Sequence, residues 1–231
     1  MKYQDLSILY EDNHLLIINK PTGVLVQGDA TGDEPLVEVC KKYIANKYQK
    51  PGAVFLGVIH RLDRPVSGVV AFARTSKALE RMNALFKNRE TKKTYWAIVA
   101  NRPPKEADKL VHWLVKDEQK NKTTAYTKET PEAQRSELNY KVIGESSGNY
   151  LLEINPITGR PHQIRVQLSS IGCAILGDLK YGAKTPASDA SIALHARQLE
   201  FVHPVKNEKL SITANPPDRE FWKVFPLPFK A

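Results

Sequence analysis

Residues 60–68 of this 231-residue chain read His60-Arg61-Leu62-Asp63-Arg64-Pro65-Val66-Ser67-Gly68. Pro65 and Gly68 favour a turn, because proline fixes one backbone angle and glycine adopts angles that are closed to other residues. Asp63 stands in this turn beside Arg61 and Arg64, and nearby cations favour the charged form of a carboxylate. Taken alone, such a stretch is more often a surface turn with solvated arginines, so its meaning depends on the rest of the chain.

A second informative segment reads Gly159-Arg160-Pro161-His162-Gln163-Ile164-Arg165-Val166-Gln167-Leu168. Two shorter motifs read Asn19-Lys20-Pro21-Thr22-Gly23 and Lys93-Thr94-Tyr95. With residues 60–68, these segments resemble the RluA-type RNA pseudouridine synthases, whose pattern is roughly H-R-L-D-x-x-T-S-G followed later by G-R-x-H-Q-I-R. The motifs occur in the family's order and span most of the chain. Val66 departs from the pattern, which usually has Thr there, so any hydrogen bond of that hydroxyl is absent.

The resemblance implies the site-specific isomerisation of uridine to pseudouridine in structured RNA. In that reaction the bond from the base nitrogen to the ribose breaks, the uracil rotates while held, and a carbon–carbon bond forms to the same sugar. No redox change or group transfer occurs, so we expect neither a cofactor nor a metal ion. The expected partner is a stem-loop of ribosomal or transfer RNA, and we expect the protein to be a monomer.

The resemblance also implies which residues carry the chemistry. Asp63 would be the essential carboxylate, which could attack the sugar or the base or act as a base toward the sugar. Arg165 would be its counter-ion, since a buried carboxylate is costly without a cation. Tyr95 would stack on the flipped base, shuttle a proton, or do both. The plainer alternatives are core packing for Tyr95 and a surface charge for Arg165.

A further set of residues is implied in RNA binding and base flipping: Arg61, Lys20, His60, Arg160, His162 and Gln163. A uridine in folded RNA must be extruded before it can react, and a side chain should fill the vacated space. Arg61 suits this role, because its planar guanidinium can stack between bases. Lys20 would support the pocket or meet a phosphate, and the alternative for it is a solvated lysine in a turn.

Composition agrees with a nucleic-acid partner. Lysine and arginine outnumber aspartate and glutamate by 34 to 25, which gives a net charge of +9 and favours a polyanion. Cys40 and Cys173 lie in apolar surroundings, which suits buried free thiols in a reducing compartment. The first ten residues lack the pattern of a signal peptide, and no run approaches the roughly 20 apolar residues of a membrane span. We therefore expect a cytoplasmic protein without membrane contact.

The pattern along the chain predicts an α+β fold with a mixed, mostly antiparallel sheet and flanking helices. Strands are predicted at residues 15–18, 69–73, 93–99, 150–155, 199–201 and 210–212, and helices at 36–44 and 79–86. Thr75 or Ser76 would cap the second of these helices. Residues 111–141, which carry Lys116, Lys120, Lys122 and Lys128, predict a β-hairpin. A short helix should end at Gly172, and residues 177–182 should form a turn.

We expect residues 1–231 to form a single catalytic domain. The Asn19-Lys20-Pro21 motif begins close to the start of this sequence, so target recognition is expected from the catalytic domain itself. No internal repeat, low-complexity tract or linker interrupts the chain.

Three rival functions fit the motifs less well. His60, His162, His195 and His203 lack the i, i+3 or i, i+4 spacing of helical zinc ligands. The kinase segment reads H-R-D rather than H-R-L-D, and no glycine-rich phosphate loop precedes it. The serious rival is a non-catalytic RNA-binding protein on the same fold. A binding module has no need of a buried ionised carboxylate, so the matched Asp63 speaks against it.

Overall fold

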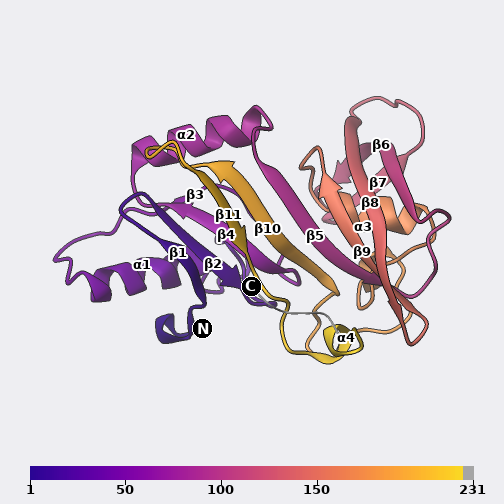
Figure 1. Cartoon of the computed structure of the whole chain (residues 1–231), viewed down its shortest axis with the longest axis horizontal. Helices are drawn as coiled ribbons and strands as arrows, with labels where there is room; N and C mark the ends of the chain where they lie inside the picture. Colours follow the sequence, from indigo (N-terminus) through magenta and orange to yellow (C-terminus); the bar gives the residue numbers. More distant parts are fainter. Residues whose placement is uncertain (226–231) are drawn as a thin grey trace. The chain divides into compact units, whose positions relative to one another are not determined.

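The computed structural model describes residues 1–225, which form two compact units (Figure 1). Unit one comprises residues 1–92 and 196–216, and unit two comprises residues 93–195 and 217–225. Each unit contains antiparallel strands with helices packed against them. The α+β prediction is therefore confirmed, whereas the prediction of one catalytic domain over residues 1–231 stays a prediction.

Unit one is built around the strands β1, β2, β4 and most of β10, in that order. The short β3 also pairs with β4, and β11 pairs with β10. The strands span Ile8–Glu11 (β1), Leu15–Lys20 (β2), Gly57–Val58 (β3), Ser67–Ala73 (β4), Leu194–Val202 (β10) and Lys209–Thr213 (β11). The helices span Tyr3–Asp5 (η1), Leu36–Lys47 (α1) and Ser76–Lys87 (α2).

The core of unit one follows from continuous apolar runs. All seven residues of β4 are buried, and so are five of the six in β2. Helix α2 packs Ala78 and Met82 against one face of these strands, where they meet Leu15 and Ala71. Its first turn is capped as predicted, because the Thr75 hydroxyl accepts a hydrogen bond from the Ala78 N–H at 3.1 Å. Because successive residues of a strand point to opposite faces, the burial of every β4 residue means that both faces of β4 are covered.

Gly68, at the start of β4, is required by a close approach of two strands. Its φ of +118° lies where residues with a side chain are strained. A Cβ at this position would also collide with the backbone of Ala196 in β10. The glycine that ends the 60–68 motif therefore allows β4 and β10 to lie together.

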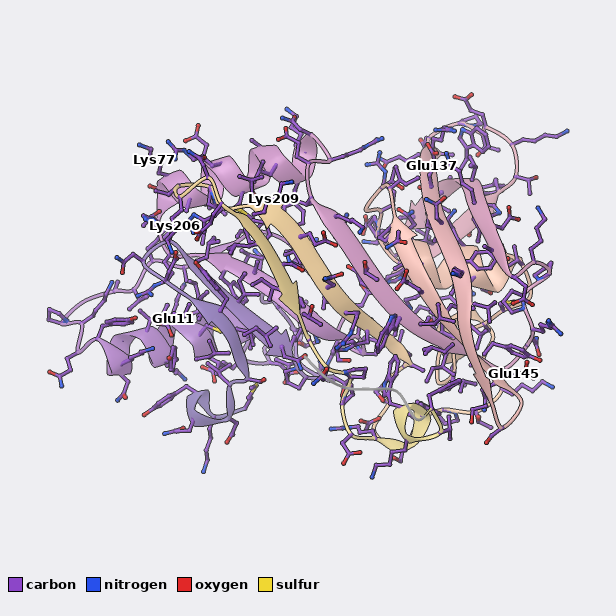
Figure 2. All side chains as sticks on the ribbon, viewed as in Figure 1. Glu11, Lys77, Glu137, Glu145, Lys206 and Lys209 are labelled. Atoms are coloured by element: carbon purple, nitrogen blue, oxygen red, sulfur yellow. The ribbon has the colours of Figure 1, made fainter. Side chains whose placement is uncertain are left out.

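Glu11, labelled in Figure 2, holds β1 to α1 through polar contacts. Its carboxylate accepts hydrogen bonds from the hydroxyls of Tyr43, at 2.9 Å, and Tyr48, at 2.8 Å. It also forms an ion pair with Lys47 at 2.7 Å. Hydrophobic periodicity did not predict β1. The polar contacts of Glu11 are made to residues that are distant in the sequence, and a local apolar pattern does not reveal such contacts.

Unit two contains five strands that pair antiparallel in the order β5-β9-β8-β6-β7. The strands span Lys92–Val99 (β5), Ala107–Asp117 (β6), Lys122–Tyr126 (β7), Gln134–Ser146 (β8) and Asn149–Pro156 (β9). The helices span Gln163–Ser170 (α3), Leu179–Tyr181 (η2) and Glu220–Lys223 (α4). Val166 of α3 packs with Leu114 of β6, Ala125 of β7 and Tyr181 of η2, so α3 lies against the predicted hairpin.

The hairpin prediction is confirmed and extended by these pairings. β6 pairs with β7 as a hairpin, and its other edge pairs with β8. The short helix ends near Gly172, whose φ is +77°, as predicted. The strands β10 and β11 confirm the predicted C-terminal pair, while the short helix α4 was not predicted.

Other predictions from composition can be compared with the described part of the chain. Cys40 and Cys173 are buried free thiols, and burial raises the pKa of Cys40 to about 12. Neither is therefore a ready nucleophile. Among residues 1–225, no helix has the length and apolar character needed to span a bilayer.

Candidate functional site

The Asp63 turn is tied to the Asn19-Lys20-Pro21 turn of unit one. Asp63 is half-buried, and its carbonyl accepts a hydrogen bond from the Val66 N–H at 3.0 Å. Arg64 donates from Nε to the Gly23 carbonyl at 3.0 Å, and the Gly23 N–H donates back to the Arg64 carbonyl at 2.8 Å. The Arg64 guanidinium also forms an ion pair with Asp33, with Nη2 2.7 Å from Oδ2. Two motifs that are distant in the sequence therefore form one fixed loop pair.

Lys20 lies beneath this loop pair and is fully buried. Its Nζ donates to the carbonyl oxygens of Pro21 at 2.9 Å, Val24 at 2.8 Å and Arg64 at 3.2 Å. Burial lowers the pKa of Lys20 to about 7, while the negative charge of Asp63 raises it and the positive charge of Arg64 lowers it further. The interpretation as a solvated turn lysine is wrong. Burial favours the supporting role over a contact with phosphate.

His60 and Arg61 occupy different environments at the start of the same segment. The Nε2 of His60 accepts a hydrogen bond from the Ala71 N–H at 3.2 Å. Its ring stacks on Phe86, with centroids 5.0 Å apart and planes 19° from parallel. Arg61 is exposed. His60 thus anchors the segment to β4 and α2, whereas Arg61 is accessible to a partner.

Val66, which stands where the family pattern has Thr, lies in the apolar core at 2% exposure. Leu62 is buried as well. The turn is therefore fixed by apolar side chains on both sides of Asp63, and a hydroxyl at position 66 would need a buried partner.

Arg165 of unit two is buried against Asp178. Its Nε lies 2.7 Å from Oδ2 of Asp178, and its Nη2 lies 2.8 Å from Oδ1. The guanidinium also lies over the ring of Tyr181, 5.0 Å from the centroid. The alternative of a surface charge is wrong for Arg165. The counter-ion role toward Asp63 stays a prediction.

Gln163 organises the loop that leads into α3. Its Oε1 accepts hydrogen bonds from the Thr158 hydroxyl at 2.8 Å and the Arg160 N–H at 3.0 Å. Its Nε2 donates to the Glu137 carbonyl at 2.9 Å. Gln163 is 4% exposed, and these three hydrogen bonds stabilise the loop before α3.

His162 precedes Gln163 and has a left-handed backbone, with φ of 55°. Its Nδ1 lies 2.7 Å from the hydroxyl oxygen of Tyr181. The imidazole is half-buried. The contact with Tyr181 fixes how the ring is turned at the N-terminus of α3.

Tyr95 lies on β5, where it pairs with Ile154 of β9. Its side chain is half-buried. The preceding Thr94 is buried, and its hydroxyl accepts a hydrogen bond from the Asn155 amide at 3.1 Å. Tyr95 therefore comes from a rigid strand, which suits a residue that must stay in position.

A surface cavity of about 270 Å³ lies beside Arg160 in unit two. It is lined by Leu114, Val115, Lys116, Glu118, Thr123, Glu132, Gln134, Arg160 and Pro161. The Thr123 hydroxyl donates to the Pro161 carbonyl at 3.1 Å, which joins β7 to the loop before α3. Arg160 is exposed and forms no ion pair with any described residue. It is therefore a cation available to an anionic partner.

The predicted site residues thus gather in two groups, one in each unit. Lys20, His60, Arg61 and Asp63 belong to unit one, and Tyr95, Arg160, His162, Gln163 and Arg165 belong to unit two. Within the part of the chain that the structure describes, no three His, Cys, Asp or Glu side chains form a cluster that could hold a metal ion.

Sequence reasoning missed two residues of this site, Asp178 and Tyr181. Both lie in the turn at residues 177–182, which was predicted only as a turn between glycines. The sequence does contain a clue. An acidic and an aromatic residue lie in a short turn that follows, in the sequence, a segment with several arginine and histidine residues. Their partners, Arg165 and His162, are visible only in the folded chain.

Comparison with known proteins gives consistent matches. A family described as RNA pseudouridylate synthase matches residues 14–170, a range that contains all four motifs. The ribosomal large subunit pseudouridine synthase C of Vibrio cholerae is 33% identical over 215 residues, covering 90% of this chain and 64% of that protein. The ribosomal large subunit pseudouridine synthase D of Zymomonas mobilis is 32% identical over 222 residues, covering 92% of this chain and 69% of that protein.

The fold also matches a solved structure. Human RNA Pseudouridylate Synthase Domain Containing 4 superposes with a TM-score of 0.77 at 28% identity, covering 92% of this chain and 89% of that chain. This chain spans about two thirds of the length of the curated relatives that it matches.

Proposed function

Because the chain belongs to the RNA pseudouridylate synthase family, we propose that it isomerises uridine to pseudouridine in structured RNA, with Asp63 as the essential carboxylate. The observation that carries this proposal is the Asp63 turn, half-buried and fixed to the Lys20 loop inside the matched range. The names of the relatives favour ribosomal RNA as the substrate over transfer RNA.

The reaction first requires a carboxylate from this chain. A carboxylate must be held close to the sugar or the base, and the contacts that fix the Asp63 turn support Asp63 in this role. An ionised carboxylate can attack the sugar, attack the base, or remove a proton from the sugar. All three routes need a charged oxygen in a shaped and partly dry pocket, where electrostatic effects are stronger than in water.

The remaining roles are proposed from the family motifs. Tyr95, on a rigid strand, would stack on the target base or transfer a proton. Arg165 would supply the countercharge for the reaction, and its buried pair with Asp178 supports a fixed orientation. A cation in one orientation loses little entropy when the substrate binds.

Exposed cations would bind the RNA, and Arg61 would help to flip the target base out of the stack. Arg61 is accessible, so it can enter the stack when the target base leaves it. Arg160 is a second exposed cation, beside the 270 Å³ cavity. With a net charge of +9, much of the affinity should be electrostatic. We propose that the protein acts in the cytoplasm, where free thiols such as Cys40 persist, and as a monomer.

The test is to map pseudouridines in ribosomal and transfer RNA from a host with and without the gene. A position that loses pseudouridine should regain it with the wild-type gene and not with Asp63→Asn. Asp5→Asn, which changes an exposed aspartate in the same way, should restore the position fully. If no pseudouridine depends on the gene, or if Asp63→Asn restores it, the proposal is wrong. RNA binding by wild type and Asp63→Asn alike, without any dependent pseudouridine, would favour a non-catalytic RNA-binding protein.

A further inference from the structure

Arg64, the residue directly after Asp63, has one fixed contact and one exposed contact. Its Nε donates to the Gly23 carbonyl at 3.0 Å. Its own carbonyl accepts hydrogen bonds from the Gly23 N–H at 2.8 Å and from Lys20 Nζ at 3.2 Å. At the outer end of the guanidinium, Nη2 lies 2.7 Å from Oδ2 of Asp33. The guanidinium is therefore oriented by the loop pair, and its outer nitrogen is occupied by a carboxylate.

Asp33 comes from an exposed acidic loop between the Lys20 turn and α1. All the residues of this loop, 27–34, are exposed, and they read Gln27-Gly28-Asp29-Ala30-Thr31-Gly32-Asp33-Glu34. The loop has three carboxylates and no lysine or arginine, in a chain whose net charge is +9. Its ends are tied together, because the Leu36 N–H donates to the Leu25 carbonyl at 2.7 Å. An acidic loop repels a polyanion, so its contact with the Asp63 turn must affect how RNA approaches that turn.

The other two carboxylates of the loop have partners of their own. Asp29 accepts a hydrogen bond from the Thr31 N–H at 2.9 Å. Hydrogen bonds from Thr31 and, to a smaller extent, the positive charge of Arg64 lower the pKa of Asp29. Glu34 forms an ion pair with Lys42 of α1. Asp33 is therefore the carboxylate of this loop that pairs with Arg64.

The pair of Arg64 and Asp33 is exposed and can be exchanged at little cost. The two side chains are 46% and 54% exposed. An ion pair in water contributes little to stability, because both charges are also well solvated when they are apart. A guanidinium binds a phosphate through the same parallel hydrogen bonds that it forms with a carboxylate. A phosphate can therefore replace Asp33 on Arg64 while the contact with Gly23 remains.

We propose that Arg64 binds a backbone phosphate of the RNA at the Asp63 turn, and that Asp33 occupies this position until the RNA binds. RNA that brings no phosphate to Arg64 meets the acidic loop instead of a free cation. Asp33 would thus favour RNA that is seated at the Asp63 turn. The phosphate contact rests on the proposed function, whereas the pair of Arg64 and Asp33 lies within unit one and does not.

The first test removes the competing carboxylate. Asp33→Asn keeps the size of an exposed side chain, so the fold should be unaffected. Affinity for a stem-loop that carries the mapped uridine, measured at low salt, should rise about threefold to fivefold, the size of one exposed ion pair. Glu34→Gln removes the neighbouring charge, which pairs with Lys42, and should change the affinity less than about twofold. No gain in Asp33→Asn, or equal gains in both variants, would overturn the inference.

The second test asks whether Asp33 acts through Arg64. In an Arg64→Gln background, Asp33→Asn should raise the affinity no more than Glu34→Gln does in the wild type. The effects of two residues that share one contact are not additive. The same gain with and without the arginine would mean that Asp33 repels RNA independently of Arg64, which contradicts the proposed exchange.

The third test measures the phosphate contact. Arg64→Gln should make the fall of affinity with salt shallower by about one unit of log–log slope, because one phosphate is no longer neutralised. Arg64→Lys also loses the Nε contact with Gly23 but keeps a positive charge, so its slope should stay close to that of the wild type. An unchanged slope in Arg64→Gln would exclude the phosphate contact. Equally shallow slopes in both variants would assign the change to the loop structure and overturn the inference.

These measurements decide the inference even where the proposed function fails. If the host shows no gene-dependent pseudouridine, the same affinities are measured with ribosomal RNA from that host, because binding does not require turnover. A gain in Asp33→Asn that disappears in the Arg64→Gln background would then support the exchange without the isomerisation. If the wild type binds no RNA, both the proposed function and the exchange are wrong.

Discussion

Arg165 and Asp178 form a two-point ion pair inside unit two, with Nε 2.7 Å from Oδ2 and Nη2 2.8 Å from Oδ1. Their side chains are 7% and 1% exposed. Parallel hydrogen bonds between a guanidinium and a carboxylate fix the plane of both groups. Arg165 is therefore oriented by its own unit before any RNA is present.

The first prediction concerns this pair. Asp178→Asn keeps the shape of the side chain but removes its charge, so the buried guanidinium loses its two-point ion pair with this carboxylate. Breaking a buried ion pair from one side costs about 3–5 kcal/mol, and we expect a loss of this size in urea unfolding. Asp218→Asn removes the exposed partner of Lys223 and should leave the unfolding curve almost unchanged. Similar small effects in both variants would show that the pair adds little to folding.

The second prediction uses Arg165 itself. Arg165→Met removes the cation that the proposed chemistry requires, and we expect the single-turnover rate to fall about a hundredfold, or about 3 kcal/mol. Arg165→Lys keeps the charge but cannot form the two-point pair with Asp178, so its rate should lie between those of wild type and Arg165→Met. RNA affinity, measured separately, should change much less. A wild-type rate in Arg165→Met would show that Arg165 is not needed for the reaction.

Some of the site could be predicted from the sequence because short-range rules determine it. The turn at residues 63–66 follows from Pro65, and the cap at Thr75 follows from its own hydroxyl, whereas Gly68, also predicted to favour the turn, lies in β4. The buried strand at residues 15–18 follows from four consecutive apolar residues. In each case the evidence lies within a few residues of the feature it predicts.

Other parts depend on contacts between distant residues. The sequence allowed Lys20 to be either a solvated lysine or a residue that supports the pocket. The choice depends on its burial, which arises only when the chain folds and the Arg64 carbonyl accepts a hydrogen bond from Nζ. The spacing of Asp178 and Tyr181 in the sequence predicted no role for them. Their partners, Arg165 and His162, contact them only in the folded chain. β1 was missed for the same reason, because Glu11 finds its partners on α1.

The third prediction follows from the lowered pKa of Lys20. Its value of about 7 in the folded protein lies below the ordinary 10.5, so between these values the unfolded chain binds more protons than the folded one. Stability contributed by this position must therefore rise with pH from about 7 to about 10. We expect the free energy of unfolding of wild type, minus that of Lys20→Met, to increase between pH 7 and pH 9.5.

The comparison cancels other groups that titrate in this range, because both proteins share them. Lys141→Met replaces an exposed lysine of unit two and serves as the control, with a difference from wild type that stays flat. A flat difference for Lys20→Met would mean that the buried ammonium keeps its ordinary proton affinity in the fold.

The fourth prediction concerns Gly68 and the approach of β4 to β10. Gly68→Ala must accommodate both a positive φ and a collision with the backbone of Ala196. We expect a loss of about 3 kcal/mol or more in unfolding free energy. Gly148→Ala also has a positive backbone angle, with φ of +71°, and open space around the new methyl group. It should cost only about 1 kcal/mol, so that the difference between the variants measures the collision.

The fifth prediction concerns how RNA is held by the hairpin of β6 and β7. Lys120 and Lys122 are exposed near its tip, and a lysine that neutralises a phosphate releases a counterion. Replacing both with Ala should make the fall of affinity with salt shallower, by about one unit of log–log slope for each phosphate that is no longer neutralised. Lys77 and Lys87 on α2 are also exposed, and replacing both with Ala is the charge-matched control.

Arg61→Ala should behave differently from the hairpin variants. A side chain that fills the gap left by an extruded base affects flipping more than encounter, so turnover should fall while the salt slope hardly changes. Binding measured at several salt concentrations, with single-turnover rates on the same RNA, separates the two effects. If the control lysines on α2 change the slope as much as the hairpin lysines, RNA has no preference for the hairpin. If replacing Lys120 and Lys122 leaves the slope unchanged, RNA is bound by another surface, since removing a lysine that neutralises a phosphate must reduce counterion release.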